Sequence, residues 1–116
     1  MKLSVTLRNK IIEFLLSLPQ IHDSKTQEIL IYSAGLDLQL EKQVTFGGSA
    51  SHFVNELVTT LINYGKLDNG QYAIESLLEA TKNYIGQDRK QYCDSLIQEL
   101  CTTIKNVTYS IEKEND

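Results

Sequence analysis

Apolar residues recur every three or four positions along most of this chain, the spacing that gathers side chains on one face of an α-helix. The pattern predicts a first helix from about residue 4 to residue 18. Its apolar face contains Leu7, Ile11, Phe14, Leu15 and Leu18. Pro19 is expected to end this helix, because proline has no backbone N–H to donate within a helix.

A second helix is predicted to begin at Asp23 or Ser24, where Ser24 followed by Gln27 matches a capping-box pattern. Gly35 suits the left-handed position that follows many helix ends. The buried side of this helix is assigned to Ile29, Leu30 and Ala34. In residues 36–42 leucines alternate as in a strand, but a lone strand would have no partner, so we expect a short helix or a tight turn there.

The fourth predicted helix begins near Ser49 or Ser51, either of which is a good N-cap, and ends at Gly65. Its wide apolar stripe indicates a helix central to the core: Phe53, Val54, Leu57, Val58, Leu61 and Ile62. The fifth follows a turn at residues 68–70 and ends at Gly86, with these positions on its apolar face: Tyr72, Ala73, Leu77, Leu78, Thr81 and Ile85.

The sixth predicted helix takes Asp88 as its N-cap, and its apolar stripe comprises Tyr92, Cys93, Leu96, Ile97, Leu100, Ile104 and Val107. With 116 residues the chain is long enough for one domain. We assign residues 1–109 to a helical bundle and residues 110–116 to a charged C-terminal tail that frays.

The formal net charge is −4 and the pI is about 5.1, which argues against a general affinity for nucleic acid or for an anionic membrane. No apolar run approaches the roughly 18–20 residues of a membrane span. The first residues include Lys2 and then Arg8 and Lys10, which does not match a signal peptide. We therefore expect a soluble, cytoplasmic protein.

The residues that could carry catalysis or bind a metal are few. Cys93 and Cys101 are separated by eight helical steps, a rise of about 12 Å, so they cannot form a disulfide while that helix is intact. Both are expected to be buried. His22 and His52 show no metal-ligand spacing. The sequence therefore predicts no enzyme, metal or cofactor.

Charged helix faces are the candidates for protein binding. Three groups stand out: Glu75, Glu79 and Lys82 on the fifth helix; Asp88, Arg89 and Lys90 at the start of the sixth; and Lys25, Gln27 and Glu28 on the second. A merely solvated face has the same pattern, and its ion pairs contribute only tenths of a kcal/mol each. The six tyrosines are mostly assigned to the margin of the core, with one or two as interface anchors.

Several stretches together resemble a known family: IIEFLLSLP at residues 11–19, SAGLD at residues 33–37, FGGS at residues 46–49 and YGKLDNGQYAIESLLEATK at residues 64–82. They are similar to the effector-associated domains of bacterial conflict and signalling systems. The resemblance extends from about residue 7 to residue 104, mostly over core and cap positions. It implies an all-α, six-helix antiparallel bundle of the death-domain-like type.

The resemblance also implies a function. In this family a domain fused to a caspase-like or trypsin-like protease, a TIR domain or an NTPase recruits a second protein that carries a matching domain. The chain would then be a non-catalytic adaptor in bacterial immunity or programmed cell death, which binds a protein with a similar domain or a second copy of itself. Since no effector domain is visible in it, the sequence leaves open whether it is free-standing or excised.

A different class of protein, a small helical DNA-binding or antitoxin-like regulator, is the alternative. It would need a recognition helix rich in basic or amide side chains. No predicted helix is basic enough, and the net charge of −4 opposes this reading. We therefore expect no binding to nucleic acid.

Overall fold

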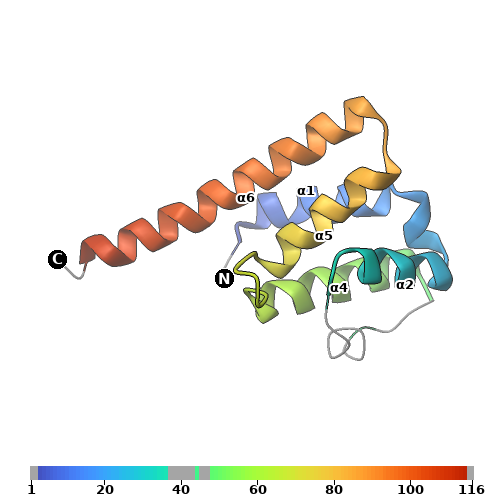
Figure 1. The fold of residues 1–116 in the computed structure, drawn as a ribbon, viewed down its shortest axis with the longest axis horizontal. Helices are drawn as coiled ribbons and strands as arrows, with labels where there is room; N and C mark the ends of the chain where they lie inside the picture. The colour runs from blue at the N-terminus through green and yellow to red at the C-terminus, as the bar shows by residue number, and fades with distance from the viewer. Residues whose placement is uncertain (1–2, 37–43, 45–47, 115–116) are drawn as a thin grey trace.

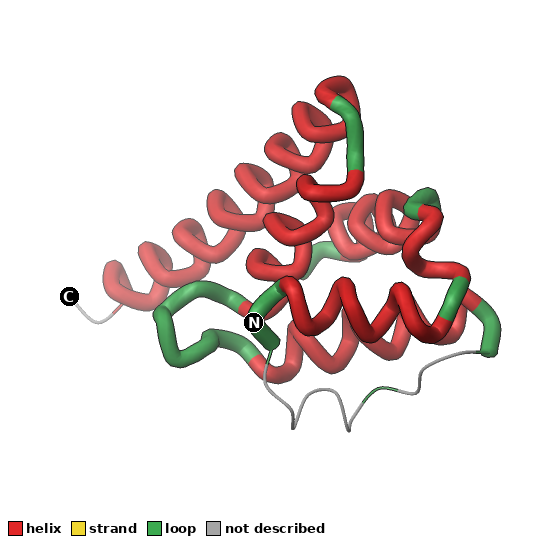
Figure 2. Tube along the Cα trace, turned by 45° about the vertical axis from the view of Figure 1, so that its right-hand side comes forward, coloured by secondary structure: helices red, strands yellow, loops and turns green. Residues whose placement is uncertain are grey.

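The structure, a computed structural model, describes residues 3–36, 44 and 48–114, with side chains described up to residue 103. These residues form five α-helices and two short 3₁₀ turns, and no strand occurs among them (Figures 1 and 2). The elements in chain order are α1 (Val5–Leu16), η1 (Pro19–His22), α2 (Ser24–Ser33), α4 (Ala50–Tyr64), α5 (Ala73–Thr81), η2 (Lys82–Tyr84) and α6 (Gln87–Glu114). The all-α prediction is confirmed. The short segment predicted at residues 36–42 lies, apart from Leu36, outside the described residues.

The helices form layers. Figure 1 shows α1 and α5 between α6 on one side and α4 on the other. Both α1 and α5 contact α4 as well as α6. The second helix, α2, contacts α5 and η1. It therefore lies at the edge of the bundle, and one of its faces points away from the core.

The apolar stripes of α1 and α4 supply much of the core. All residues assigned to these two stripes are at most 6% exposed. Ser4 caps α1 by accepting a hydrogen bond from Leu7 N at 3.1 Å, and Ser49 caps α4 by accepting one from His52 N at 3.1 Å. Of the two predicted starts, Ser49 is the N-cap of α4. The apolar stripe of α4 is buried as predicted, but the helix forms an outer layer of the bundle, and the helix covered on three sides is α5.

The fifth helix is more enclosed than its sequence indicates. Every residue of α5 is buried except Glu75 and Glu79, because α2, α4 and α6 cover it from three sides. Two of the buried residues are polar and find partners nearby. Ser76 Oγ donates to Gln71 Oε1 at 2.8 Å, and Thr81 Oγ1 donates to the Leu78 carbonyl at 2.6 Å.

The second helix differs from its prediction in both its cap and its buried face. Asp23 is the N-cap, and its side chain accepts a hydrogen bond from Thr26 N at 3.3 Å. Gln27 forms no capping box; it is buried, and its Nε2 donates to the Ile21 carbonyl at 2.6 Å. The buried face is formed by Gln27, Leu30 and Ile31, so the assignment of Ile29 to the core was wrong. Ile29 is 50% exposed.

Two glycines end helices as predicted. Gly35 has a φ of 72°, and the bonds from Gly35 N to the Tyr32 carbonyl and from Leu36 N to the Ile31 carbonyl form a Schellman motif after α2. Gly65 has a φ of 83° and donates to the Leu61 carbonyl at the end of α4. Positive φ is readily adopted only by glycine, which explains both residues.

Three other predicted boundaries were wrong. The first helix ends at Leu16, and Pro19 begins η1, where its missing N–H is not needed. The fifth ends at Thr81 and continues as η2, so Gly86 does not terminate it. Instead the Gly86 carbonyl accepts a bond from Lys90 N at the start of α6. Asp88 therefore lies in the first turn of α6, where a carboxylate suits the helix dipole, and is not its cap.

The sixth helix is continuous as far as Glu114, beyond the position where we place the start of the tail. In its described part Cys93, Leu96, Ile97 and Leu100 are buried as predicted, but Tyr92 is 46% exposed. Tyr92 lies beside Phe14 of α1, with the ring centroids 5.9 Å apart. Ile104 and Val107 lie outside the residues whose side chains are described.

The two cysteines also differ from each other. Cys93 is fully buried, and its Sγ donates to the Leu78 carbonyl at 3.2 Å. Burial raises the pKa of the Cys93 thiol above its usual value. Cys101, which we expected to be buried, is only half-buried, with its Sγ 3.7 Å from Glu75 Oε1.

We predict that Leu61→Ala lowers the free energy of unfolding by about 2–5 kcal/mol, because it leaves a cavity at a fully buried site in α4. Urea unfolding followed by circular dichroism measures the change. Asn63→Ala, at an exposed position of the same helix, is the control and should change stability by less than about 0.5 kcal/mol. Equal stabilities of the two variants would contradict the burial of α4.

Thiol reactivity provides a second test of the fold. In the folded protein a disulfide reagent should modify Cys101 before Cys93, because the Cys93 thiol is buried and its raised pKa leaves little thiolate. Cys101→Ser should leave one slow thiol, and urea should make both cysteines react at the same rate. Fast modification of Cys93 in the folded Cys101→Ser variant would show that α6 does not pack on α5 as described.

Candidate protein-interaction surface

Charged side chains between α5 and α6 are used within the fold. Lys82 Nζ lies 3.1 Å from Glu79 Oε2 and also forms an ion pair with Asp94 of α6. Hydrogen bonding to Asp94 and to Glu79 raises the pKa of Lys82. Lys82 is thus shared between two carboxylates, and all three charged groups take part in contacts between α5 and α6 or within that junction.

Glu75 does not share an outer face with Glu79. It is half-buried and faces α6, where its Oε1 accepts a weak hydrogen bond from Cys101 Sγ. Glu79 is exposed. The sequence could not separate these two glutamates, because both fall on the polar side of α5 and only the path of α6 distinguishes them.

At the start of α6, Arg89 holds the helix against α1. Its guanidinium donates a hydrogen bond to Ser17 Oγ and lies 5.4 Å from the centroid of the Phe14 ring, a cation–π distance. Asp88 is exposed and Lys90 is half-buried, and neither side chain forms an ion pair among the described residues. Of the three residues predicted at positions 88–90, Arg89 therefore stabilises the contact between α6 and α1.

The outward face of α2 has a different composition. Lys25, Glu28, Ile29 and Tyr32 are three or four residues apart and so lie on one side of the helix. All four are exposed, Ile29 by 50% and Tyr32 by 77%. We call these four residues the α2 surface. Tyrosine is enriched at the centre of protein interfaces, and charged side chains such as Lys25 and Glu28 are found at their polar rim.

The two charged side chains of the α2 surface, Lys25 and Glu28, have no partner among the described residues. Within the part of the chain that the structure describes, neither Lys25 nor Glu28 forms an ion pair or a side-chain hydrogen bond, although they are one turn apart. In contrast, ion pairs tie α1 to α6 through Lys10 and Glu99 and α5 to α6 through Lys82. The α2 surface therefore carries two charges that no described residue pairs with.

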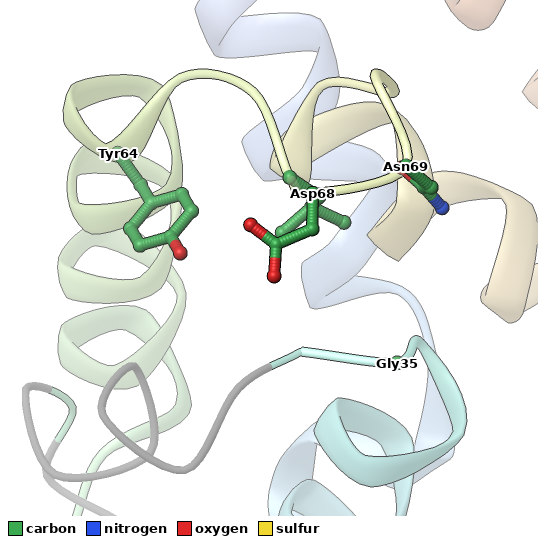
Figure 3. A pocket seen from close by; sticks show the side chains of 5 residues that line it. Gly35, Tyr64, Asp68 and Asn69 are labelled. Carbon is green, nitrogen blue, oxygen red and sulfur yellow. The ribbon is translucent and has the colours of Figure 1, made fainter.

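A shallow hollow of about 210 Å³ lies where the end of α2 approaches the turn between α4 and α5. It is lined by Gly35, Tyr64, Leu67, Asp68 and Asn69. Figure 3 shows the Tyr64 ring and the Asp68 carboxylate facing the same open space, with Gly35 across from them. The predicted turn is present, since Gly70 N donates to the Leu67 carbonyl at 2.9 Å.

The histidines serve local roles. His52 Nε2 lies 3.0 Å from Glu56 Oε2 one turn along α4, and His22 Nε2 lies 3.3 Å from the Leu16 carbonyl. Among the described residues no group of three or more histidine, cysteine or acidic side chains is arranged to hold a metal ion. In the same part of the chain, no helix has the length and apolar character needed to span a membrane.

Comparison with known families agrees with the resemblance seen in the sequence. The model of effector-associated domain 8 matches residues 5–100, which include α1, α2, α4, α5 and the first half of α6. No curated protein and no solved structure matches the chain significantly. The family match covers most of the chain and all of the described core. The chain therefore belongs to the effector-associated domain 8 family.

Proposed function

We propose that this domain is a non-catalytic adaptor that recruits effector proteins by binding a similar domain in the partner. Membership of a family of effector-associated domains supports the class of function. One observation supports the α2 surface as the binding site. Lys25 and Glu28 form no ion pair with a described residue, and they lie beside the exposed side chains of Ile29 and Tyr32.

The proposal includes the architecture expected of a death-domain-like protein, a six-helix antiparallel bundle. The five described helices and their layered packing support it. In such a bundle the outward helix faces are the parts available for association, and α2 is one of them.

Docking through the α2 surface would combine two physical effects. Burying Tyr32 and Ile29 removes apolar area from water, at about 25 cal/mol per Å² before the costs of association. Pairing Lys25 and Glu28 with opposite charges on the partner provides selectivity and orientation. Because exposed charges are screened by salt, the interaction should weaken as ionic strength rises.

In the cell, the partners we propose are effector proteins that carry a matching domain together with a protease, a TIR domain or an NTPase. The process would be bacterial immunity or programmed cell death, and it would take place in the cytoplasm. No nucleic acid, membrane, metal or cofactor is part of the proposal.

Pull-down of the products of neighbouring genes tests the proposal. At least one product with a similar domain should bind, more strongly at low than at high salt, and Tyr32→Ala should weaken binding about tenfold if Tyr32 is an interface anchor. Glu28→Ala should also weaken it. Glu13→Ala is the matched control, since Glu13 is exposed on α1 and has no side-chain partner in the described part of the chain.

Two results would contradict the proposal. The first is that no neighbouring product binds at either salt concentration while the domain shifts a DNA probe, which would favour a DNA-binding regulator. The second is that Glu13→Ala weakens binding whereas Glu28→Ala and Tyr32→Ala leave it unchanged, which would place the interface on α1.

A further inference from the structure

The charges of the α2 surface are arranged so that the surface complements itself. Lys25 and Glu28 have opposite sign, are separated by one helical turn and are not paired with each other or with another described residue. A face with one charge of each sign can meet an identical face in two orientations. Only one of them brings opposite charges together.

In a two-fold symmetric contact, a residue i that touches residue j of the second copy is matched by j touching i. If two α2 helices run antiparallel about an axis between positions 25 and 28, Lys25 of each copy faces Glu28 of the other. Two ion pairs then form and no like charges are opposed. A parallel arrangement would instead bring Lys25 near Lys25, which is unfavourable.

The apolar residues favour the same contact. Ile29 and Tyr32 follow Glu28 on the same side of α2 and are 50% and 77% exposed. In the antiparallel arrangement they extend past the charge pairs over the first turn of the second copy and toward its η1, where Pro19 and His22 are exposed. The two ion pairs would then be flanked at each end by a tyrosine.

We propose that two copies of this domain associate through α2, antiparallel about a two-fold axis, with Lys25 of each copy paired to Glu28 of the other. The inference rests on the proposed function and specifies the surface and geometry of its like-with-like contact. One helix face buries little area, so the dimer is of the weak, transient class and forms in a concentration- and salt-dependent way.

Charge exchange tests this geometry. Lys25→Glu and Glu28→Lys should each weaken self-association at least about tenfold, because each turns both ion pairs into repulsions. An equimolar mixture of the two variants should associate, because the first presents only acidic side chains at these two positions and the second only basic ones. The doubly exchanged variant, Lys25→Glu with Glu28→Lys, should self-associate like the native protein. Sedimentation equilibrium at low salt measures all four samples.

Glu13→Lys is the control, because it reverses an exposed charge on α1 that has no ion-pair partner among the described residues, and it should leave self-association unchanged. Circular dichroism establishes that each variant is folded. Failure of the mixture to associate, or native-like self-association of either single variant, would overturn the antiparallel α2 contact. A native protein that stays monomeric but binds a neighbouring effector-associated domain would overturn this inference and leave the proposed function standing.

Discussion

The packing of α5 against three other helices is the contact on which the rest of the fold depends. A nine-residue helix is not stable alone in water, so α5 exists because α2, α4 and α6 cover it. The same packing determines which face of each outer helix is exposed to solvent. Since α2 uses Leu30, Ile31 and Gln27 to lie against the bundle, its remaining side is turned outward.

The distribution of ion pairs follows from this arrangement. The long helix α6 crosses both α1 and α5, and it is joined to them by Lys10 with Glu99 and by Lys82 with Asp94. Arg89 adds a contact with Phe14 at the end of α1. These charged residues therefore stabilise the packing of α6 on α1 and α5, whereas Asp88 and Lys90 at its start have no ion pair among the described residues. The edge helix α2 has no such neighbour among the described elements on its outward side, and Lys25 and Glu28 form no ion pair with a described residue.

Much of the core could be predicted from the sequence where one helix buries one face. The stripes of α1 and α4 follow a spacing of three and four throughout, and Ser49, Gly35 and Gly65 mark helix boundaries by local chemistry that needs no tertiary contact. The family could also be recognised, because its matching residues are mostly these core and cap positions.

The candidate interaction surface was harder to predict, because it depends on which side of a helix another helix covers. Gln27 looks like a capping residue in the sequence but occupies a core position, where the Ile21 carbonyl satisfies its amide. With Gln27, Leu30 and Ile31 on the buried face, Ile29 lies on the outside. Contacts such as Lys82 with Asp94 join residues twelve apart across a turn and leave no local pattern.

The central claim is that the outward face of α2 is the docking surface, whereas Asp94 and Glu99 of α6 form ion pairs within the fold. An NMR titration in which the protein is concentrated at low salt tests it most directly. Docking through α2 predicts concentration-dependent shifts of the Ile29 methyl groups, the Tyr32 ring and the α2 amides, with little change in α5 and α6. Shifts confined to α6, with α2 unchanged, would contradict the claim.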